Sequence, residues 1–174
     1  MPEAPAGRGL LLLDTHIWVW LMEGDASHLS DGVIAELEAA SNRGALAVSA
    51  ISIWELAMLE VKGRVRLSRS LDEWVRAALS ARGTQLLALT PEIAIESARL
   101  PGKPPGDPAD RILMATSRIE AAQLVTRDRA ILKYGTSGHI SVLKRTTARG
   151  SATSQSAAGR RTGTGVEKFV RGLR

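Results

Sequence analysis

Short apolar runs alternate along the chain with longer segments of helical periodicity. The runs predict strands over residues 10–13, 45–48, 86–89, 123–126 and 139–143. Continuous apolar strands separated by helices are typical of a parallel sheet that is buried on both faces. We therefore predict an α/β fold with a central, mostly parallel sheet between two layers of helices.

The segments between these runs predict helices over residues 17–22, 30–43, 52–62, 71–82, 91–100, 108–121 and 127–134. Ser30 is a suitable capping residue for the second of them. Thr90-Pro91 and Asp107-Pro108 each place a capping residue before a proline at the first helical position. Residues 17–22 are apolar on every side, which is more than one sheet face can cover. We expect this surface to form a homodimer, unless the helix over 30–43 covers it within the monomer.

Charge is distributed unevenly along the chain. Residues 144–174 hold eight Lys and Arg against one Glu, so their net charge is +7, whereas residues 1–143 total −2. The final segment is rich in Ser, Thr, Gly, Ala and Arg without apolar periodicity, a composition typical of disorder. We predict a loose leader over residues 1–9, one domain over 10–145, and a basic, disordered tail over 146–174.

Composition narrows the possible chemistry. Cysteine is absent, so a disulfide, a thiolate metal site and a cysteine nucleophile are all excluded. With three histidines, at positions 16, 28 and 139, any metal is expected to be held by oxygen, which favours Mg²⁺ or Mn²⁺. No stretch approaches the roughly 18 uninterrupted apolar residues of a membrane span. We predict a cytoplasmic protein that does not enter the membrane.

Four carboxylates stand close to the predicted strand ends. Asp14, Glu55 and Asp128 each follow a strand, and Asp110 lies in the first turn of a helix. Structural alternatives exist for each of them. Asp14 and Asp128 could cap helices, Glu55 could complete a capping box with Ser52, and Asp110 could favour the helix dipole.

The repetition of this placement points to a shared site. Ligands of parallel α/β sheets lie outside the carboxyl ends of the strands. Four carboxylates in one pocket repel each other, and a multivalent cation is the natural way to neutralise them. Asp107 is better explained as the helix cap alone, and we leave it outside this group.

At these positions the sequence resembles the PIN domain, in particular the VapC-type toxins of bacterial toxin–antitoxin pairs. Five segments carry the resemblance, in the order of the family: Leu11-Leu-Leu-Asp-Thr-His16, Val48-Ser-Ala-Ile-Ser-Ile-Trp-Glu-Leu56, Leu89-Thr-Pro-Glu-Ile93, Asp107-Pro-Ala-Asp-Arg-Ile-Leu-Met-Ala115 and Leu124-Val-Thr-Arg-Asp128. The resemblance implies a PIN-like three-layer sandwich and hydrolysis of RNA phosphodiester bonds. It also implies homodimerisation and inhibition by a cognate antitoxin protein. In the family site, the positions that match Asp14, Glu55, Asp110 and Asp128 hold Mg²⁺ or Mn²⁺.

We assign Asp14 and Asp110 as the principal metal ligands. Glu55 would position or deprotonate the attacking water, or complete a second metal site, and Asp128 would hold the metal directly or through water. Thr15 and Thr126 could add hydroxyls beside the metal, although a buried hydroxyl with a hydrogen-bond partner is the preferred interpretation of each. The four tryptophans, at positions 18, 20, 54 and 74, are expected in the core or in dimer contacts.

Two other functions compete with this one. A phosphohydrolase of the haloacid dehalogenase type needs a second Asp two residues after the first, where this chain has His16, and no Gly-rich phosphate loop is present. A catalytically inactive PIN module that binds RNA or sequesters an antitoxin is the alternative from another class, and the presence of all four acids argues against it. The basic tail departs from the family, whose members usually end near the last strand. It could add RNA affinity by counterion release, but we favour a solvated tail without function.

Overall fold

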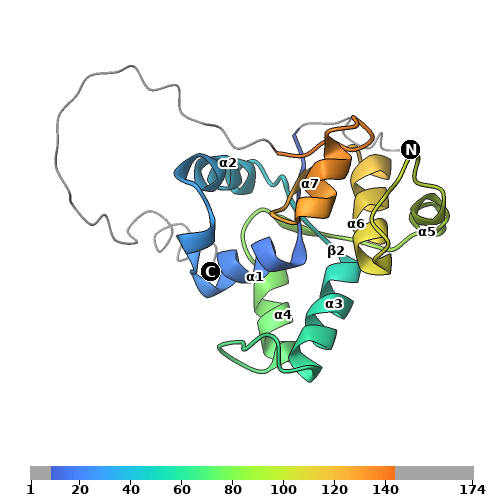
Figure 1. Cartoon of the computed structure of the whole chain (residues 1–174). Helices are drawn as coiled ribbons and strands as arrows, with labels where there is room; N and C mark the ends of the chain where they lie inside the picture. The colour runs from blue at the N-terminus through green and yellow to red at the C-terminus, as the bar shows by residue number, and fades with distance from the viewer. Residues whose placement is uncertain (1–8, 144–174) are drawn as a thin grey trace, which may run out of the picture.

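The computed structural model of the chain describes residues 9–143. The expected tail and all of the expected leader except Gly9 lie outside the described residues, so the bounds of these two segments stay predictions. The elements, in chain order, are β1 (Leu11–Leu13), α1 (Thr15–Glu23), the short 3₁₀ helix η1 (Ala26–His28), α2 (Asp31–Asn42), β2 (Leu46–Ser49), α3 (Ala50–Val61), α4 (Leu71–Leu79), β3 (Thr84–Leu87), α5 (Pro91–Ala98), α6 (Pro108–Ile119), β4 (Gln123–Val125) and α7 (Arg129–Gly135) (Figure 1).

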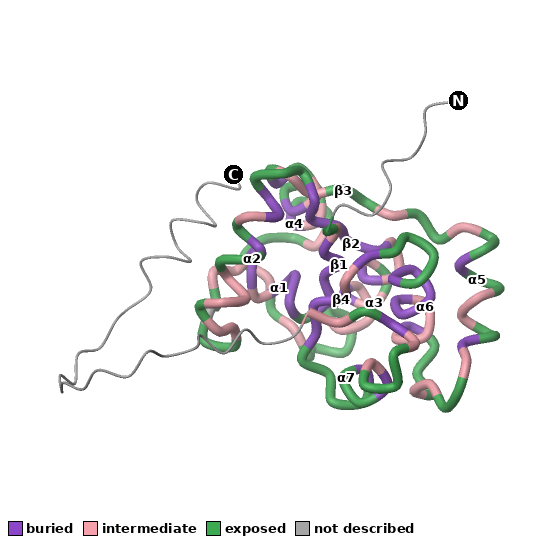
Figure 2. The backbone as a smooth tube through the Cα atoms, turned by 90° about the horizontal axis from the view of Figure 1, so that it is seen from above, coloured by how far each residue is buried: buried purple, intermediate pink, exposed green. Residues whose placement is uncertain are grey.

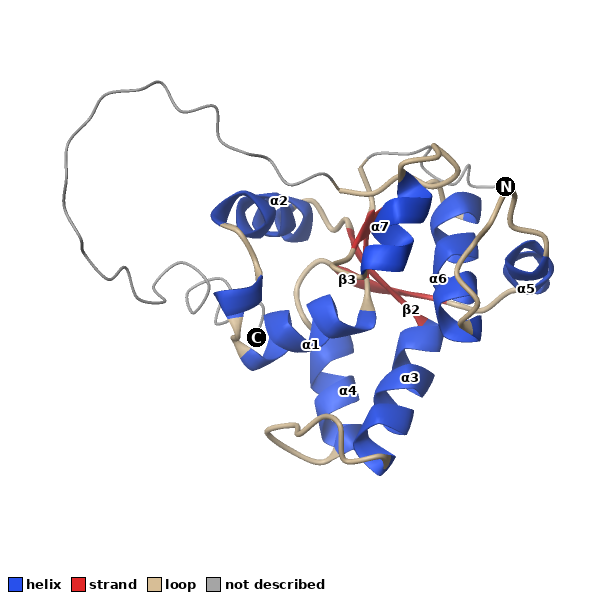
Figure 3. Ribbon diagram, viewed as in Figure 1, coloured by secondary structure: helices blue, strands red, loops and turns tan. Residues whose placement is uncertain are grey.

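The sheet is parallel throughout, with strand order β3-β2-β1-β4. Leu12 of the central strand β1 stands opposite Ala47 of β2 on one side and Leu124 of β4 on the other. All residues of β1 and β2 are buried. Helices surround the strands (Figure 3), and the predicted α/β fold with a parallel central sheet is confirmed.

Alternate residues of the strands enter two separate apolar clusters. Leu11 and Leu13 face a cluster that contains residues of α1, α2 and α4. Leu12 faces the other cluster, which contains residues of α5, α6 and α7. Successive side chains of a strand point to opposite faces, so these two clusters are the two sides of one sheet. Figure 2 shows the buried strands inside this shell of helices.

Two strand predictions need correction. The edge strand β3 begins and ends two residues earlier than predicted, because its residues are half-buried or exposed and apolarity does not mark their limits. The predicted strand over 139–143 is wrong. The only pairing there is a single parallel bridge between Leu124 and Val142, supported by hydrogen bonds of Leu124 with Ser141 and Leu143. One bridge does not extend into a strand.

The first helix is covered within the monomer. Ile17, Trp18, Val19, Leu21 and Met22 are all buried. They belong to the same cluster as residues of α2 and α4, and the indole of Trp18 meets that of the α4 tryptophan edge to face, with ring centroids 4.9 Å apart. The expectation that α1 exposes a dimer surface is therefore wrong, and the alternative of cover within the monomer is right. The homodimer itself stays a prediction.

The tryptophans divide between core and surface. Trp18 and Trp74 are buried, Trp20 is half-buried and stacks on His28 at 4.2 Å, and the side chain of Trp54 is 56% exposed. Among residues 9–143, no helix is both long enough and apolar enough to cross a membrane.

Candidate functional site

Asp14 lies directly after β1, at the N-cap position of α1. Its side chain makes no capping hydrogen bond, so the capping explanation is wrong for this carboxylate. It is 7% exposed and instead accepts a hydrogen bond of 2.5 Å from the Thr126 hydroxyl. The same hydroxyl accepts from the backbone N–H of Asp128 at 2.9 Å. Thr126 thus links the carboxyl ends of β1 and β4 through the two acids.

Glu55 faces the beginning of α1 instead of capping its own helix. Helix α3 begins at Ala50, and Ser49 is its N-cap, accepting from the backbone N–H of Ile51 at 3.3 Å. Ser52 is therefore inside the helix, and the predicted capping box does not form. The Glu55 carboxylate accepts a hydrogen bond of 2.6 Å from the hydroxyl of the fully buried Thr15. This hydrogen bond holds the carboxylate of Glu55 beside the start of α1, where the charge of Asp14 acts on it.

Two further acids cap helices at the same edge of the sheet. Asp128 accepts through Oδ1 from the backbone N–H groups of Ala130 and Ile131, at 2.8 and 2.9 Å. Asp107 likewise caps α6. The capping explanation is right for both, but it does not remove either acid from the group. Asp128 accepts both of these hydrogen bonds through Oδ1. The charge of Asp107 acts on Asp110.

Burial and the charges of neighbouring acids raise the pKa of three carboxyls in this region. Burial, together with repulsion from Asp107, Asp128, Asp14 and Glu55, raises the pKa of Asp110 to about 7. The pKa of Asp14 is raised by burial in spite of its hydrogen bond with Thr126, and that of Glu55 by burial in spite of the Thr15 hydroxyl. Asp110 therefore lies within electrostatic range of carboxylates from the ends of β1 and β4 and from α3. That these acids form one metal site stays a prediction.

Asp107 is the member that sequence reasoning missed. Its position explains it as a helix cap, yet its charge also raises the pKa of both Asp110 and Glu55. The available signal was its spacing, because residues three apart at the start of a helix lie on neighbouring positions of its surface. The interpretation of Thr15 and Thr126 as buried hydroxyls with hydrogen-bond partners is confirmed.

The donor set suits a hard divalent cation, although the acids do not form a complete binding group. The ion pairs within residues 9–143 are His28–Asp25 and Arg118–Glu96, so no Lys or Arg neutralises the converging acids. Carboxylate and hydroxyl oxygens are the ligands that Mg²⁺ prefers. Across the described part of the chain, however, no three His, Asp or Glu side chains are gathered closely enough to hold a metal. The chemistry and the charge of the residues fit a cation, although the side chains as they stand do not enclose one.

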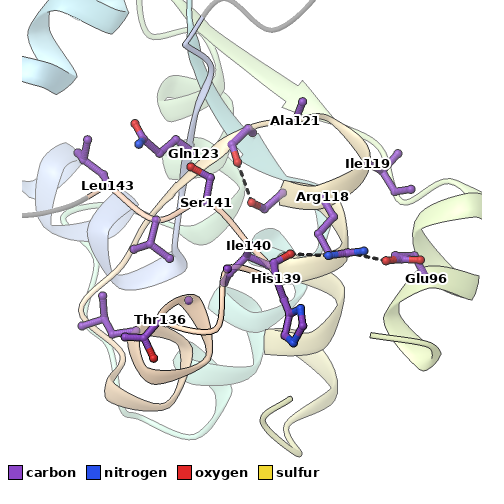
Figure 4. Close-up of a pocket in the computed structure, with 16 residues that line it drawn as sticks. Glu96, Arg118, Ile119, Ala121, Gln123, Thr136, His139, Ile140, Ser141 and Leu143 are labelled. Atoms are coloured by element: carbon purple, nitrogen blue, oxygen red, sulfur yellow. Dashed lines mark hydrogen bonds and ion pairs between the residues drawn. The ribbon is translucent and has the colours of Figure 1, made fainter. Parts of the chain in front are cut away.

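A groove of about 1340 Å³ lies where β4 begins, away from the acids at the carboxyl ends of the strands (Figure 4). It is lined by the last turn of α6, the beginning of β4, part of α7 and residues 138–143. Arg118 stands on its wall, where it pairs with Glu96 at 2.6 Å and donates to the carbonyl of His139. None of the converging acids lines this groove. The groove and the acids thus lie in different places. The acids, of which Asp14 is buried and Glu55 and Asp110 are half-buried without a Lys or Arg partner, are the stronger indication of chemistry.

A family model and a related sequence identify the family, and a solved structure shares the fold. The family model described as the PIN domain matches residues 11–136, a range that includes all four predicted site residues. The chain is 35% identical over 124 residues to Ribonuclease VapC22 of Mycobacterium tuberculosis (strain ATCC 25618 / H37Rv), covering 71% of this chain and 91% of the relative. Among solved structures, VapBC2 from Rickettsia felis bound to a DNA fragment from their promoter matches with a TM-score of 0.55 and 19% identity. That match covers 77% of this chain and 97% of the other, and it shows a shared fold.

Proposed function

The chain belongs to the PIN domain family, and from this premise we propose that it is a VapC-type ribonuclease toxin that hydrolyses RNA with Mg²⁺ or Mn²⁺ held by Asp14, Glu55, Asp110 and Asp128. The observation that carries the proposal is that the buried Asp14 is held by Thr126 and Glu55 by Thr15, beside Asp110, whose pKa burial and the other acids raise to about 7. Perturbed carboxylates without a cationic partner are typical of sites that bind metal or transfer protons.

Each side chain has a proposed role. Asp14 and Asp110 hold the cation, and Asp128 holds it directly or through water. The cation, when bound, polarises the scissile phosphate and lowers the pKa of a water molecule. Glu55 receives the proton of the attacking water, a role that suits a carboxylate whose pKa is raised, or completes a second metal site beside the first. The Thr15 and Thr126 hydroxyls orient Glu55 and Asp14, because each donates one short hydrogen bond to its acid.

Two partners belong to the same proposal. RNA is the substrate, and a cognate antitoxin protein binds the enzyme and restrains it, as the resemblance to VapC-type toxins implies. We place this activity in the cytoplasm.

A homodimer is also proposed, with a different surface from the one first expected. Trp54, Met58 and Val61 follow one another at spacings of four and three residues and so form one stripe of α3. Trp54 is 56% exposed and Val61 is 81% exposed, and a contiguous apolar surface of this kind is typical of protein interfaces.

Val61→Lys should convert a dimer into a monomer in light scattering. Ile95→Lys, at an exposed apolar position of α5, is the matched control, and loss of the dimer in both variants or in neither would contradict this surface.

The test of the catalytic proposal is RNA cleavage by the full-length protein. Cleavage should require Mg²⁺ or Mn²⁺ and stop in EDTA, and Asp14→Asn or Asp110→Asn should lower the rate by about 10²-fold or more, because charge stabilisation by the cation is lost. Glu38→Gln, which removes an exposed acid of α2, should leave the rate unchanged. Undiminished cleavage in excess EDTA would refute the mechanism. RNA binding without cleavage in Mg²⁺ would favour the inactive PIN module instead.

A further inference from the structure

Residues 62–69, which we call the basic loop, join α3 to α4 and carry an unusual concentration of positive charge. The loop holds Lys62, Arg64, Arg66 and Arg69, all exposed, and no acid. Residues 9–143 as a whole contain fourteen Lys and Arg against sixteen Asp and Glu. The described ion pairs involve none of the four cations of the loop. Their charge is therefore available to a partner outside the domain.

The backbone of the basic loop is anchored, although its charged side chains face water. Val65 and Leu67 alternate with the arginines and pack against the apolar cluster beside α1 and α4. Ser68 donates to the carboxylate of Glu23, from its backbone N–H at 3.4 Å and from its hydroxyl at 3.1 Å. Gly63 ends α3 at a φ of +65°, a conformation that favours glycine. A partner that binds this loop does not have to order its backbone first, which lowers the entropy cost of binding.

Helices α1 and α3 connect the basic loop to the acidic site. Lys62 follows Glu55 by seven residues, so it lies two turns further along the same side of α3, at about 10 Å for a rise of 1.5 Å per residue. Helix α1 begins at Thr15, which binds Glu55, and ends at Glu23, which binds Ser68 of the loop. Figure 1 shows the connection between α3 and α4 at the end of α3 remote from β2. A nucleic-acid strand that leaves the acidic site along these helices therefore reaches the basic loop within a few nucleotides.

We propose that the basic loop binds backbone phosphates of the RNA substrate and holds the strand across α3. The inference rests on the proposed function, and it answers an electrostatic difficulty that this function raises. An acidic domain repels RNA, most of all at its cluster of carboxylates, and exposed cations nearby recover affinity by releasing the counterions of the phosphates. Arginine suits this role because its guanidinium can donate two parallel hydrogen bonds to one phosphate. Such contacts position the strand without reading its sequence.

The experiment measures RNA affinity as a function of salt, with metal removed so that cleavage does not interfere. Full-length protein in EDTA is titrated into a fluorescein-labelled single-stranded RNA of mixed sequence. The variant is Arg64→Gln with Arg66→Gln. The control is Arg43→Gln with Arg82→Gln, which removes the same amount of charge. Both arginines are exposed and lie just before β2 and β3, so they are at the amino ends of these strands, away from the acids at the carboxyl ends. The tail is present in every protein, so its contribution is constant.

The loop variant should lower the slope of log affinity against log salt by about 1.4, since each phosphate contact with a single strand contributes about 0.7. The ratio of wild-type to variant affinity should then fall about sevenfold between about 50 and about 200 mM salt. The control should keep the wild-type slope, and Arg64→Lys with Arg66→Lys should restore most of it. An unchanged slope in the loop variant, an equal loss in the control, or no measurable RNA binding by the wild type would overturn the inference. Cleavage in Mg²⁺, measured on the same proteins, separates the two proposals: cleavage with an unchanged slope refutes the loop alone, and a loop-dependent slope without cleavage refutes the catalytic proposal alone.

Discussion

Replacing Asp110 by Asn should stabilise the metal-free protein at neutral pH while it abolishes activity. The pKa of Asp110 is raised from 3.8 to about 7 in the folded protein. The unfolded chain therefore loses this proton first as the pH rises, and between pH 3.8 and about 7 the folded state binds more protons than the unfolded state. The free energy of unfolding must fall across that window and stay low above it. Asn carries no charge, so the variant does not incur this loss.

The shift sets the size of the effect. About three pKa units correspond to about 4 kcal/mol at 1.36 kcal/mol per unit, and solvent screening of a half-buried group reduces this to about 2 kcal/mol. In a domain of this length about 2 kcal/mol corresponds to a rise of about 6 °C in Tm. The gain should be present at pH 7.5 and nearly absent at about pH 3, because the carboxyl of Asp110 is then largely protonated in both the folded and the unfolded wild type.

Thermal melts of the full-length protein in EDTA at the two pH values measure the difference, with Glu38→Gln as the control for removing one exposed acid. Mg²⁺ should raise the Tm of the wild type more than that of Asp110→Asn, because it binds the folded state preferentially. A variant that is less stable than the wild type at pH 7.5, or whose gain is the same at both pH values, would refute the convergence of the acids on Asp110.

Two other perturbations follow from the same structure. Truncation after Arg145 should leave the circular dichroism spectrum of the folded domain and its RNA cleavage intact, because every helix and strand described here lies before that residue; a protein that no longer folds would make the tail structural. Thr126→Val should lower the free energy of unfolding by about 2 kcal/mol in denaturant titrations, since it leaves the buried Asp14 carboxylate and the N–H of Asp128 without their partner. Thr126→Ser should keep most of that stability, and equal losses in the two variants would show that the methyl group matters instead of the hydroxyl.

The central strands and many helix ends could be predicted from sequence because their causes are local. The strands β1, β2 and β4 are short apolar runs, and burial on both faces requires that composition. Ser30, Thr90 and Asp107 do cap the helices that follow them. The capping box at Glu55 failed because the pattern does not say where a helix begins, and α3 begins two residues before Ser52.

The features that could not be predicted depend on contacts between distant segments. The cover of α1 comes from two helices, α2 and α4, and the sequence does not show which elements return to a given face. The hydrogen bonds from Thr15 and Thr126 join residues 40 and 112 positions apart. The convergence of the acids was foreseeable in outline, because carboxyl ends of parallel strands share an edge. The contribution of Asp107 was not foreseeable, since helix capping is a sufficient local explanation of that residue.

The central claim is that the converging acids hold a divalent cation, and Mn²⁺ binding to the full-length protein tests it most directly. Electron paramagnetic resonance distinguishes free from bound Mn²⁺ in a titration without RNA, so the measurement does not depend on catalysis. The wild type and Glu38→Gln should bind Mn²⁺ at the same saturable site. Asp14→Asn and Asp110→Asn should each weaken that binding by at least about tenfold, because each removes a charged oxygen ligand. Equal Mn²⁺ binding by all four proteins, or no binding by the wild type, would contradict the claim.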